Sequence, residues 1–213
     1  ISIMLKTSQL SYSYDKNNTI HFPDINCQKD EHWLLLGQSG TGKTTLLHLL
    51  GGLRKAQNGS VTVTGQDLSQ LPSSQLDAFR GKHIGIVFQQ SHFVASLTVE
   101  ENLLLAQYLA GVPQDKTRIK TLLSKLNLSH KLQSKPKALS QGEQQRVAIA
   151  RALVNSPKVI LADEPTSALD DENCKEVVEL LESQAREQEA ALLIVTHDQR
   201  LKDYFKNQII LTK

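Results

Sequence analysis

The sequence predicts an α/β fold with a mostly parallel sheet that is interrupted by an all-α segment. Short apolar runs bounded by turn residues recur in the first and last thirds of the chain, as expected of buried strands. Segments with helical apolar spacing alternate with these runs, a pattern typical of a parallel sheet covered by helices. Residues 91–156 keep helical spacing only, which indicates a helical insert.

Six segments have the character of strands. Residues 33–36 form an apolar run, and residues 61–64 alternate with a period of two before Gly65. We also expect a small antiparallel β portion near the N-terminus. The remaining predicted strands are residues 83–88, 158–162, 190–196 and 208–211.

Helix starts are marked by capping residues. Thr98 and Glu101 form a capping box ahead of an apolar run, and Ser140 and Glu143 form a second one. Asp171 is expected to cap a later helix with one apolar stripe. The apolar positions with helical spacing are Leu46, Leu47, Leu49, Leu50 and Leu53, then Ile119, Leu122, Leu123 and Leu126, and finally Cys174, Val177, Val178 and Leu181.

The length of the chain suits one domain. With 213 residues it can bury a full core once, but hardly twice. We therefore expect a single domain over 1–213, with a core lobe of about 1–90 and 157–213 and a helical subdomain of about 91–156.

Composition excludes several classes of protein. No apolar run approaches the roughly 18 residues of a membrane span, and the N-terminus has no secretory pattern, so we expect a soluble, cytosolic chain. The net charge of only +2 does not indicate a nucleic-acid-binding protein. Cys27 and Cys174 are isolated, which fits two thiols in a reducing compartment rather than a metal site.

The strongest motif is a phosphate loop at residues 37–44, directly after the apolar run 33–36. It matches G-x-x-x-x-G-K-[ST], and its strand-loop-helix context predicts a P-loop NTPase core whose loop N–H groups bind an anion. Lys43 would reach the β- and γ-phosphates, and Thr44 would bind Mg²⁺. The candidate loop residues are Gly37, Gln38, Ser39, Gly40, Thr41, Gly42, Lys43, Thr44 and Thr45.

A second candidate site follows the apolar strand at residues 159–162. Asp163 would lie at the carboxyl edge of the sheet beside the phosphate loop, where it can hold Mg²⁺ through water. Glu164 is then placed to orient the attacking water. The alternative is that Asp163, Glu164 and Pro165 form a turn that only solvates the end of the strand.

Residues 139–146, Leu-Ser-Gln-Gly-Glu-Gln-Gln-Arg, resemble the signature segment of ABC-type ATPases. The other motifs of that family follow in its order: Tyr14 stands where an adenine-stacking aromatic is expected, residues 87–89 resemble the glutamine loop, residues 167–170 the D-loop, and residues 196–198 the switch histidine. The resemblance covers essentially the whole chain.

The resemblance implies ATP and Mg²⁺ as ligands. It implies that Tyr14 stacks on adenine, although nearby Tyr12 is an alternative, and that His197 contacts the γ-phosphate. Thr44, Gln89 and Asp163 would hold the metal, while Glu164, His197, Lys43 and Gln89 would serve catalysis. Ser140 and Gly142 would contact the γ-phosphate held by another copy. A purely structural role is the alternative for three of these residues: Ser140 as a helix cap, and His197 and Gln89 as ordinary strand-end residues.

The chain departs from the family pattern at two signature positions. Gln141 replaces a glycine and Glu143 replaces a glutamine, and the added side chain of Gln141 puts the signature contacts in doubt. Residues 91–102 look like the patch that receives the coupling helix of a membrane subunit. That segment lacks the proline often found near Ala95 or Ser96.

The resemblance implies an ATP-binding and ATP-hydrolysing subunit that powers a membrane transporter, most like the lipoprotein-releasing and macrolide-exporter branch. Expected partners are a transmembrane permease subunit and, when ATP is bound, a second copy or a second ATPase subunit. The expected location is peripheral, on the cytoplasmic face of the inner membrane, with no nucleic acid bound. Two alternatives stay open: a soluble ABC ATPase acting in DNA repair or on ribosomes, and a small P-loop kinase.

Overall fold

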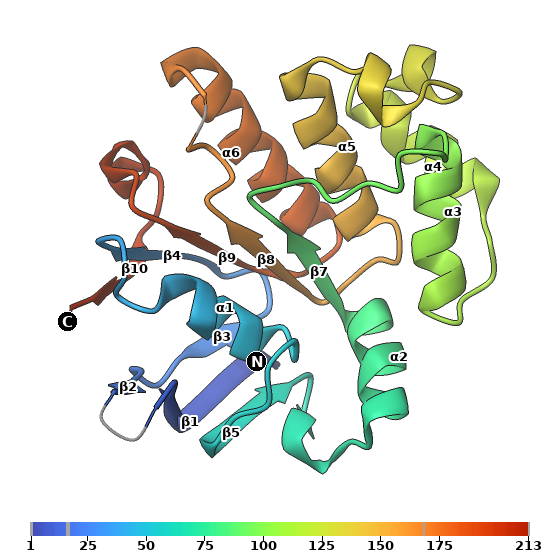
Figure 1. The fold of residues 1–213 in the computed structure, drawn as a ribbon. Helices are drawn as coiled ribbons and strands as arrows, with labels where there is room; N and C mark the ends of the chain where they lie inside the picture. Colours follow the sequence, from blue (N-terminus) through green and yellow to red (C-terminus); the bar gives the residue numbers. More distant parts are fainter. Residues whose placement is uncertain (1, 16–17, 168, 213) are drawn as a thin grey trace.

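The computed structural model describes residues 2–15, 18–167 and 169–212. Two sheets lie one above the other, and helices cover the outer face of the larger one (Figure 1). The smaller sheet and one helix cover its inner face. This arrangement confirms the predicted α/β class with a parallel sheet and an antiparallel portion near the N-terminus.

The larger sheet is parallel throughout, in the order β10-β4-β9-β8-β7. Both faces of its central strands are covered, which explains why these strands read as nearly continuous apolar runs, whereas the edge strand β10 is partly exposed. Its strands are β4 (His32–Gly37), β7 (Ile84–Val87), β8 (Val159–Asp163), β9 (Ala191–Thr196) and β10 (Asn207–Leu211).

The smaller sheet is antiparallel and built around β1, which pairs with β2, β3 and β5. Its strands are β1 (Ile3–Ser13), β2 (Thr19–His21), β3 (Asn26–Gln28), β5 (Asn58–Val63) and β6 (Gln66–Asp67). Helix α1 (Lys43–Leu50) lies between the two sheets, and its leucines join a buried cluster with Leu35 and Leu193 of the parallel sheet. The phosphate loop is therefore anchored from two sides.

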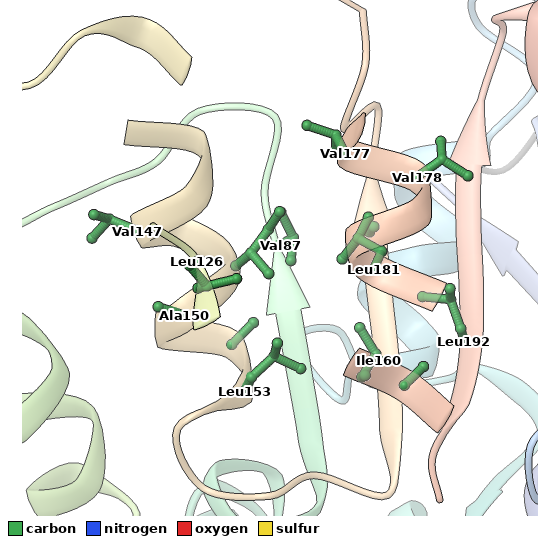
Figure 2. Packing of buried hydrophobic residues seen from close by; sticks show 14 of the residues in the cluster. Val87, Leu126, Val147, Ala150, Leu153, Ile160, Val177, Val178, Leu181 and Leu192 are labelled. Carbon is green, nitrogen blue, oxygen red and sulfur yellow. The ribbon is translucent and has the colours of Figure 1, made fainter. Parts of the chain in front are cut away.

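The outer face of the parallel sheet carries a second buried cluster. Figure 2 shows Val147, Ala150 and Leu153 of α5 (Gln141–Leu153) beside Val87 of β7, with Leu181 of α6 (Asp171–Glu187) over the neighbouring strands. Buried residues of α3 (Val99–Leu109) and α4 (Lys116–Lys125) belong to the same cluster. These helices lie within the segment expected to form a helical subdomain; the division into two lobes stays a prediction.

Both predicted capping boxes are present, at Thr98 with Glu101 and at Ser140 with Glu143. The predicted cap of α6 was wrong by one residue. Asp170 is the cap, since its Oδ1 accepts from the Asn173 N–H at 2.9 Å, and Asp171 is the first helical residue. Two aspartates in succession made the choice ambiguous from sequence.

Helix α2 (Ser73–His83) was not predicted. None of its residues is fully buried, and the apolar pair that packs against the core, Leu76 and Phe79, is too short a stripe to reveal a helix. It extends through His83, and β7 therefore begins at Ile84 rather than at the predicted residue 83. Short 3₁₀ helices at Leu68–Gln70, Ser129–Lys131, Pro136–Ala138 and Gln199–Asp203 connect the longer elements.

Candidate functional site

The phosphate loop turns tightly between β4 and α1. Gly40 and Gly42 have φ of +80° and +89°, a left-handed conformation that glycine adopts without steric cost. At Gly37 the constraint is space, because an added Cβ would lie 2.6 Å from Thr41 Oγ1. The loop backbone thus needs glycine at the fixed positions of the motif, and α1 starts directly after it at Lys43.

A cavity of about 580 Å³ opens beside this loop. Parallel strands place their carboxyl ends at one edge of a sheet, so the segments after β4, β7, β8 and β9 converge there. The cavity is lined by Tyr14, Ile20, Ser39, Gly40, Gly42, Lys43, Thr44, Thr45, Gln89, Glu164 and His197. Residues from five separate predicted motifs or positions are therefore brought to one place.

Lys43 is buried and its ammonium group is held by the loop itself. Nζ donates to the carbonyl oxygens of Gly37, at 2.8 Å, and Gln38, at 3.0 Å. It also lies 3.7 Å from Glu164 Oε1. The positive charge is thus fixed between the phosphate loop and the carboxylate that follows β8.

Glu164 is held by the neighbouring strand β9. Its Oε2 accepts from Thr196 Oγ1 at 2.7 Å and from the His197 N–H at 3.3 Å, while its Oε1 lies 2.8 Å from His197 Nδ1. Its backbone has φ of +48°, a left-handed conformation that is unfavourable for a glutamate and that aims the side chain into the cavity. Its backbone N–H donates to the Val195 carbonyl oxygen at 2.8 Å, which ties this residue to β9.

Thr196 is the functional contact that sequence reasoning missed. It is fully buried, and its hydroxyl is the shortest hydrogen-bond donor to Glu164. The signal was present in the strand pattern: Asp163 pairs with Val195, so the next residues of the two parallel strands, Glu164 and Thr196, lie side by side.

Asp163 has the environment of a metal ligand. It is 5% exposed, and its Oδ1 has no hydrogen-bond partner. Burial raises the pKa of its carboxyl group, and a hydrogen bond with the Thr44 side chain opposes that rise. An unsatisfied buried carboxylate oxygen next to a hydroxyl suits Mg²⁺, which is commonly bound by one or two carboxylates together with waters and substrate phosphates.

The described residues contain no group of three or more His, Cys, Asp or Glu side chains that could hold a metal ion alone. The donor set around Asp163 would need oxygens from a phosphate ligand to be complete. Gln89 lines the same cavity and its side chain is exposed, so it can contribute an amide oxygen.

Tyr14, and not Tyr12, reaches the cavity. Its hydroxyl is hydrogen-bonded to Thr45 Oγ1, and its side chain is exposed. Arg54 lies over the rings of both tyrosines, at 5.4 Å from each centroid, while Tyr12 packs against the inner core cluster. The geometry favours Tyr14 as the aromatic group nearest to a bound base.

Other predicted site residues lie outside the cavity lining. Gln38 and Thr41 are joined by a hydrogen bond within the loop, 2.9 Å from Thr41 Oγ1 to the Gln38 carbonyl. Ser140 and Gly142 stand at the start of α5, where Ser140 is the helix cap and a Cβ added at Gly142 would lie 3.9 Å from the Arg146 side chain. Ala168 of the predicted D-loop lies outside the described residues.

The fold and this cavity define a P-loop ATPase, and comparison with known proteins narrows the class. The family described as ABC transporter matches residues 21–167, and the chain belongs to this family. It is an ATP-binding and ATP-hydrolysing subunit of the kind that powers membrane transport. No helix in the described part of the chain is long and apolar enough to cross a membrane.

Two curated relatives are similar over most of the chain. The lipoprotein-releasing system ATP-binding protein LolD of Geobacter metallireducens is 40% identical over 217 residues, covering 99% of this chain and 96% of LolD. The macrolide export ATP-binding/permease protein MacB of Aggregatibacter actinomycetemcomitans is 40% identical over 204 residues, covering 93% of this chain and 32% of MacB. These matches confirm the predicted resemblance to this branch, and nothing in them favours DNA repair or ribosomes.

Solved structures of ATP-binding cassettes have the same fold. The dimeric post-hydrolysis state of the cassette MJ0796, bound to ADP and Pi, has a TM-score of 0.87 at 32% identity and covers 98% of this chain and 94% of that one. CbiO1 from Clostridium perfringens, part of the transporter complex cbiONQ, has a TM-score of 0.88 at 27% identity and covers 100% and 86%. The ATPase fold predicted from the motifs is confirmed.

Proposed function

We propose that this chain is the ATPase of a lipoprotein-releasing or macrolide-export type transporter, bound at the cytoplasmic face of the membrane to a membrane-spanning permease partner. Two copies, or one copy and a second ATPase subunit, would pair head to tail around two ATP molecules. The placement of Glu164 between Lys43 and His197 in one cavity carries the proposal. Similarity to LolD over 99% of the chain supports the branch.

The cavity offers each group that ATP hydrolysis needs. Lys43 and the loop N–H groups stabilise negative charge on the β- and γ-phosphates, as phosphoryl transfer requires. Glu164 orients the attacking water or accepts its proton, and Thr196 fixes the carboxylate in place. His197 contacts the γ-phosphate through its second ring nitrogen. Tyr14 stacks on the adenine.

Mg²⁺ fits the residues around Asp163. The unpartnered Asp163 Oδ1 would bind it directly or through water, with the Thr44 hydroxyl and the Gln89 amide oxygen as further ligands. When bound, the ion supplies positive charge that offsets the charge developing on the β- and γ-phosphates. The ammonium group of Lys43 supplies a second positive charge next to the same phosphates.

The N-terminus of α5 explains why two copies would pair. Ser140 and Gly142 are absent from the cavity lining of their own chain, although a helix N-terminus with exposed N–H groups binds anions well. They would instead complete the ATP site of a second copy. ATP must then favour the dimer by the same factor by which dimerisation favours ATP.

Light scattering of the Glu164→Gln variant tests the proposal. We expect a monomer without nucleotide and a doubled mass with MgATP, because binding occurs and hydrolysis does not reopen the pair. Gly142→Leu in the same background should abolish the doubling. That substitution fits the chain itself, since an added Cβ at Gly142 meets only Arg146, at 3.9 Å.

Ser140→Arg should also prevent pairing, but it removes a helix cap worth about 1 kcal/mol as well, so Gly142→Leu is the cleaner variant. ATP binding to the monomer should be unchanged in both. A mass that MgATP leaves unchanged at high protein concentration, in the parent and also after Gln141→Gly, would contradict the head-to-tail pair. Recovery of the dimer by Gln141→Gly would instead locate the weakness in the signature.

A further inference from the structure

The N-terminus of α5 carries a full negative charge of its own. Glu143 Oε2 accepts from the Ser140 N–H at 2.8 Å, and Ser140 Oγ accepts from the Glu143 N–H at 3.2 Å. This box stabilises the helix. Glu143 stands where the family signature has a glutamine, so a carboxylate replaces a neutral amide. It does so at the N-terminus of α5, the helix end that is proposed to meet a phosphate.

The size of the two charges makes this carboxylate important. The end of a helix is equivalent to about half an elementary positive charge, whereas an ionised carboxylate carries a whole negative one. Hydrogen bonds to the backbone hold the pKa of Glu143 below its ordinary value, so it is ionised at neutral pH. Unless another group offsets it, this end of α5 would repel an anion.

Lys131 is placed to offset that charge. It ends the 3₁₀ helix Ser129–Lys131, and its Nζ lies 3.3 Å from Glu143 Oε1. Both side chains are largely shielded, at 24% and 16% exposure. Each carboxylate oxygen of Glu143 therefore has a partner: Oε2 accepts from the Ser140 N–H, and Oε1 is paired with the Lys131 ammonium group. His130 Nε2 lies 3.6 Å from the same oxygen, but its side chain is 65% exposed.

We propose that Lys131 is a positioning residue for the ATP site of the partner copy: it neutralises Glu143 and so keeps the N-terminus of α5 attractive to the γ-phosphate. The inference rests on the head-to-tail pair proposed above. Lys131 acts through Glu143 and does not itself contact the nucleotide. The need for Lys131 therefore exists only while Glu143 is charged.

A double-mutant cycle isolates this dependence. Gln is the other residue that completes a capping box, so Glu143→Gln removes the charge and keeps the cap. In the Glu164→Gln background, Lys131→Met should raise the MgATP concentration needed for half-maximal dimerisation about tenfold or more, measured by light scattering near pH 8. With Glu143→Gln also present, Lys131→Met should change that concentration less than about twofold. Lys131→Arg should behave like the parent.

Lys137→Met is the matched control, because it removes an exposed lysine from the same segment and no contact joins Lys137 to Glu143 in the described structure. It should leave dimerisation near the parent value. ATP affinity of the monomer and the melting temperature should be similar in Lys131→Met and Lys137→Met.

The outcomes separate cleanly. Lys131→Met could weaken MgATP-dependent dimerisation equally whether residue 143 is Glu or Gln. That result would overturn the inference, because it would mean that Lys131 stabilises the fold or contacts the phosphate directly. No loss in either background, or an equal loss from Lys137→Met, would overturn it too. A parent whose mass never doubles, even after Gln141→Gly, would refute the proposed pair itself, and this inference with it, whereas a normal parent with an unaffected Lys131→Met refutes the inference alone.

Discussion

Glu164 and His197 are hydrogen-bonded to each other, with 2.8 Å between Oε1 and Nδ1. They follow neighbouring parallel strands, so their contact is a direct result of β8 lying beside β9. The contact uses Nδ1, so the other ring nitrogen, Nε2, takes no part in it.

Glu164→Gln should bind ATP normally and hydrolyse it roughly 10² to 10⁴ times more slowly, the usual contribution of a positioned base. The amide keeps the size of the side chain, and its oxygen can still accept from Thr196 Oγ1, now 2.7 Å from the carboxylate. Steady-state phosphate release measures the effect. Turnover at the parent rate would show that the Asp163-Glu164 pair is structural only.

Lys43→Met should weaken MgATP binding far more than adenosine binding. The substitution keeps most of the buried aliphatic chain but removes the ammonium group that now donates to Gly37 and Gln38. Displacement of a fluorescent nucleotide by each ligand gives both affinities, and adenosine is the internal control because it lacks phosphates. Equal MgATP affinities in the parent and the variant would show that Lys43 does not bind the phosphates.

Tyr14→Ala should weaken ATP and GTP alike, since stacking contributes about 1 to 3 kcal/mol per base and every base has a π-face. Tyr12→Ala is the matched control, because Tyr12 touches the same Arg54 but packs toward the core. Equilibrium titration with both nucleotides decides between them. A loss of affinity in Tyr12→Ala alone would mean that the wrong tyrosine has been chosen.

Stability should fall as the pH is lowered below about 5, because helix-capping carboxylates become protonated. The backbone N–H of Thr98 holds the pKa of Glu101 below its usual value, and Asn173 does the same for Asp170. A pKa lower in the folded chain means that the unfolded chain binds more protons in this range. Stability from these groups is thus present above about pH 5, falls as the pH passes through the unfolded pKa values of about 3.9 to 4.3, and is lost at the lower pKa values of the folded chain.

Urea unfolding between pH 7 and pH 3.5 measures this dependence. Glu101→Gln keeps the capping box but does not titrate there, so its free energy of unfolding should depend less steeply on pH. Identical pH slopes for the parent and the variant would contradict the assigned role of Glu101.

The parts that sequence predicted well have strong local signals. The phosphate loop needs glycine for its left-handed turns, and the capping boxes at Thr98 and Ser140 join residues three apart, so each was visible in a short window. The parallel sheet was visible because strands covered on both faces are almost wholly apolar.

The parts that were missed depend on pairing between distant segments. The hydrogen bond from Thr196 to Glu164 joins residues 32 apart and appears only once β8 and β9 are in register. Helix α2 has no fully buried residue, and the two apolar side chains that pack against the core, Leu76 and Phe79, are too short a pattern for periodicity to reveal it. The prediction named Tyr14 but left Tyr12 as an alternative, because sequence does not show in which direction each ring points at the end of β1.

The seat of α5 on β7 is unusually close, since a Cβ added at Gly85 would lie 2.4 Å from the Ala152 carbonyl oxygen. A side chain at residue 85 would therefore push the C-terminal part of α5 away from the strand. Because β7 leads into Gln89 at the cavity, the position of α5 and the position of Gln89 both depend on this one strand, and the absence of a side chain at Gly85 is what lets the helix backbone lie directly against it.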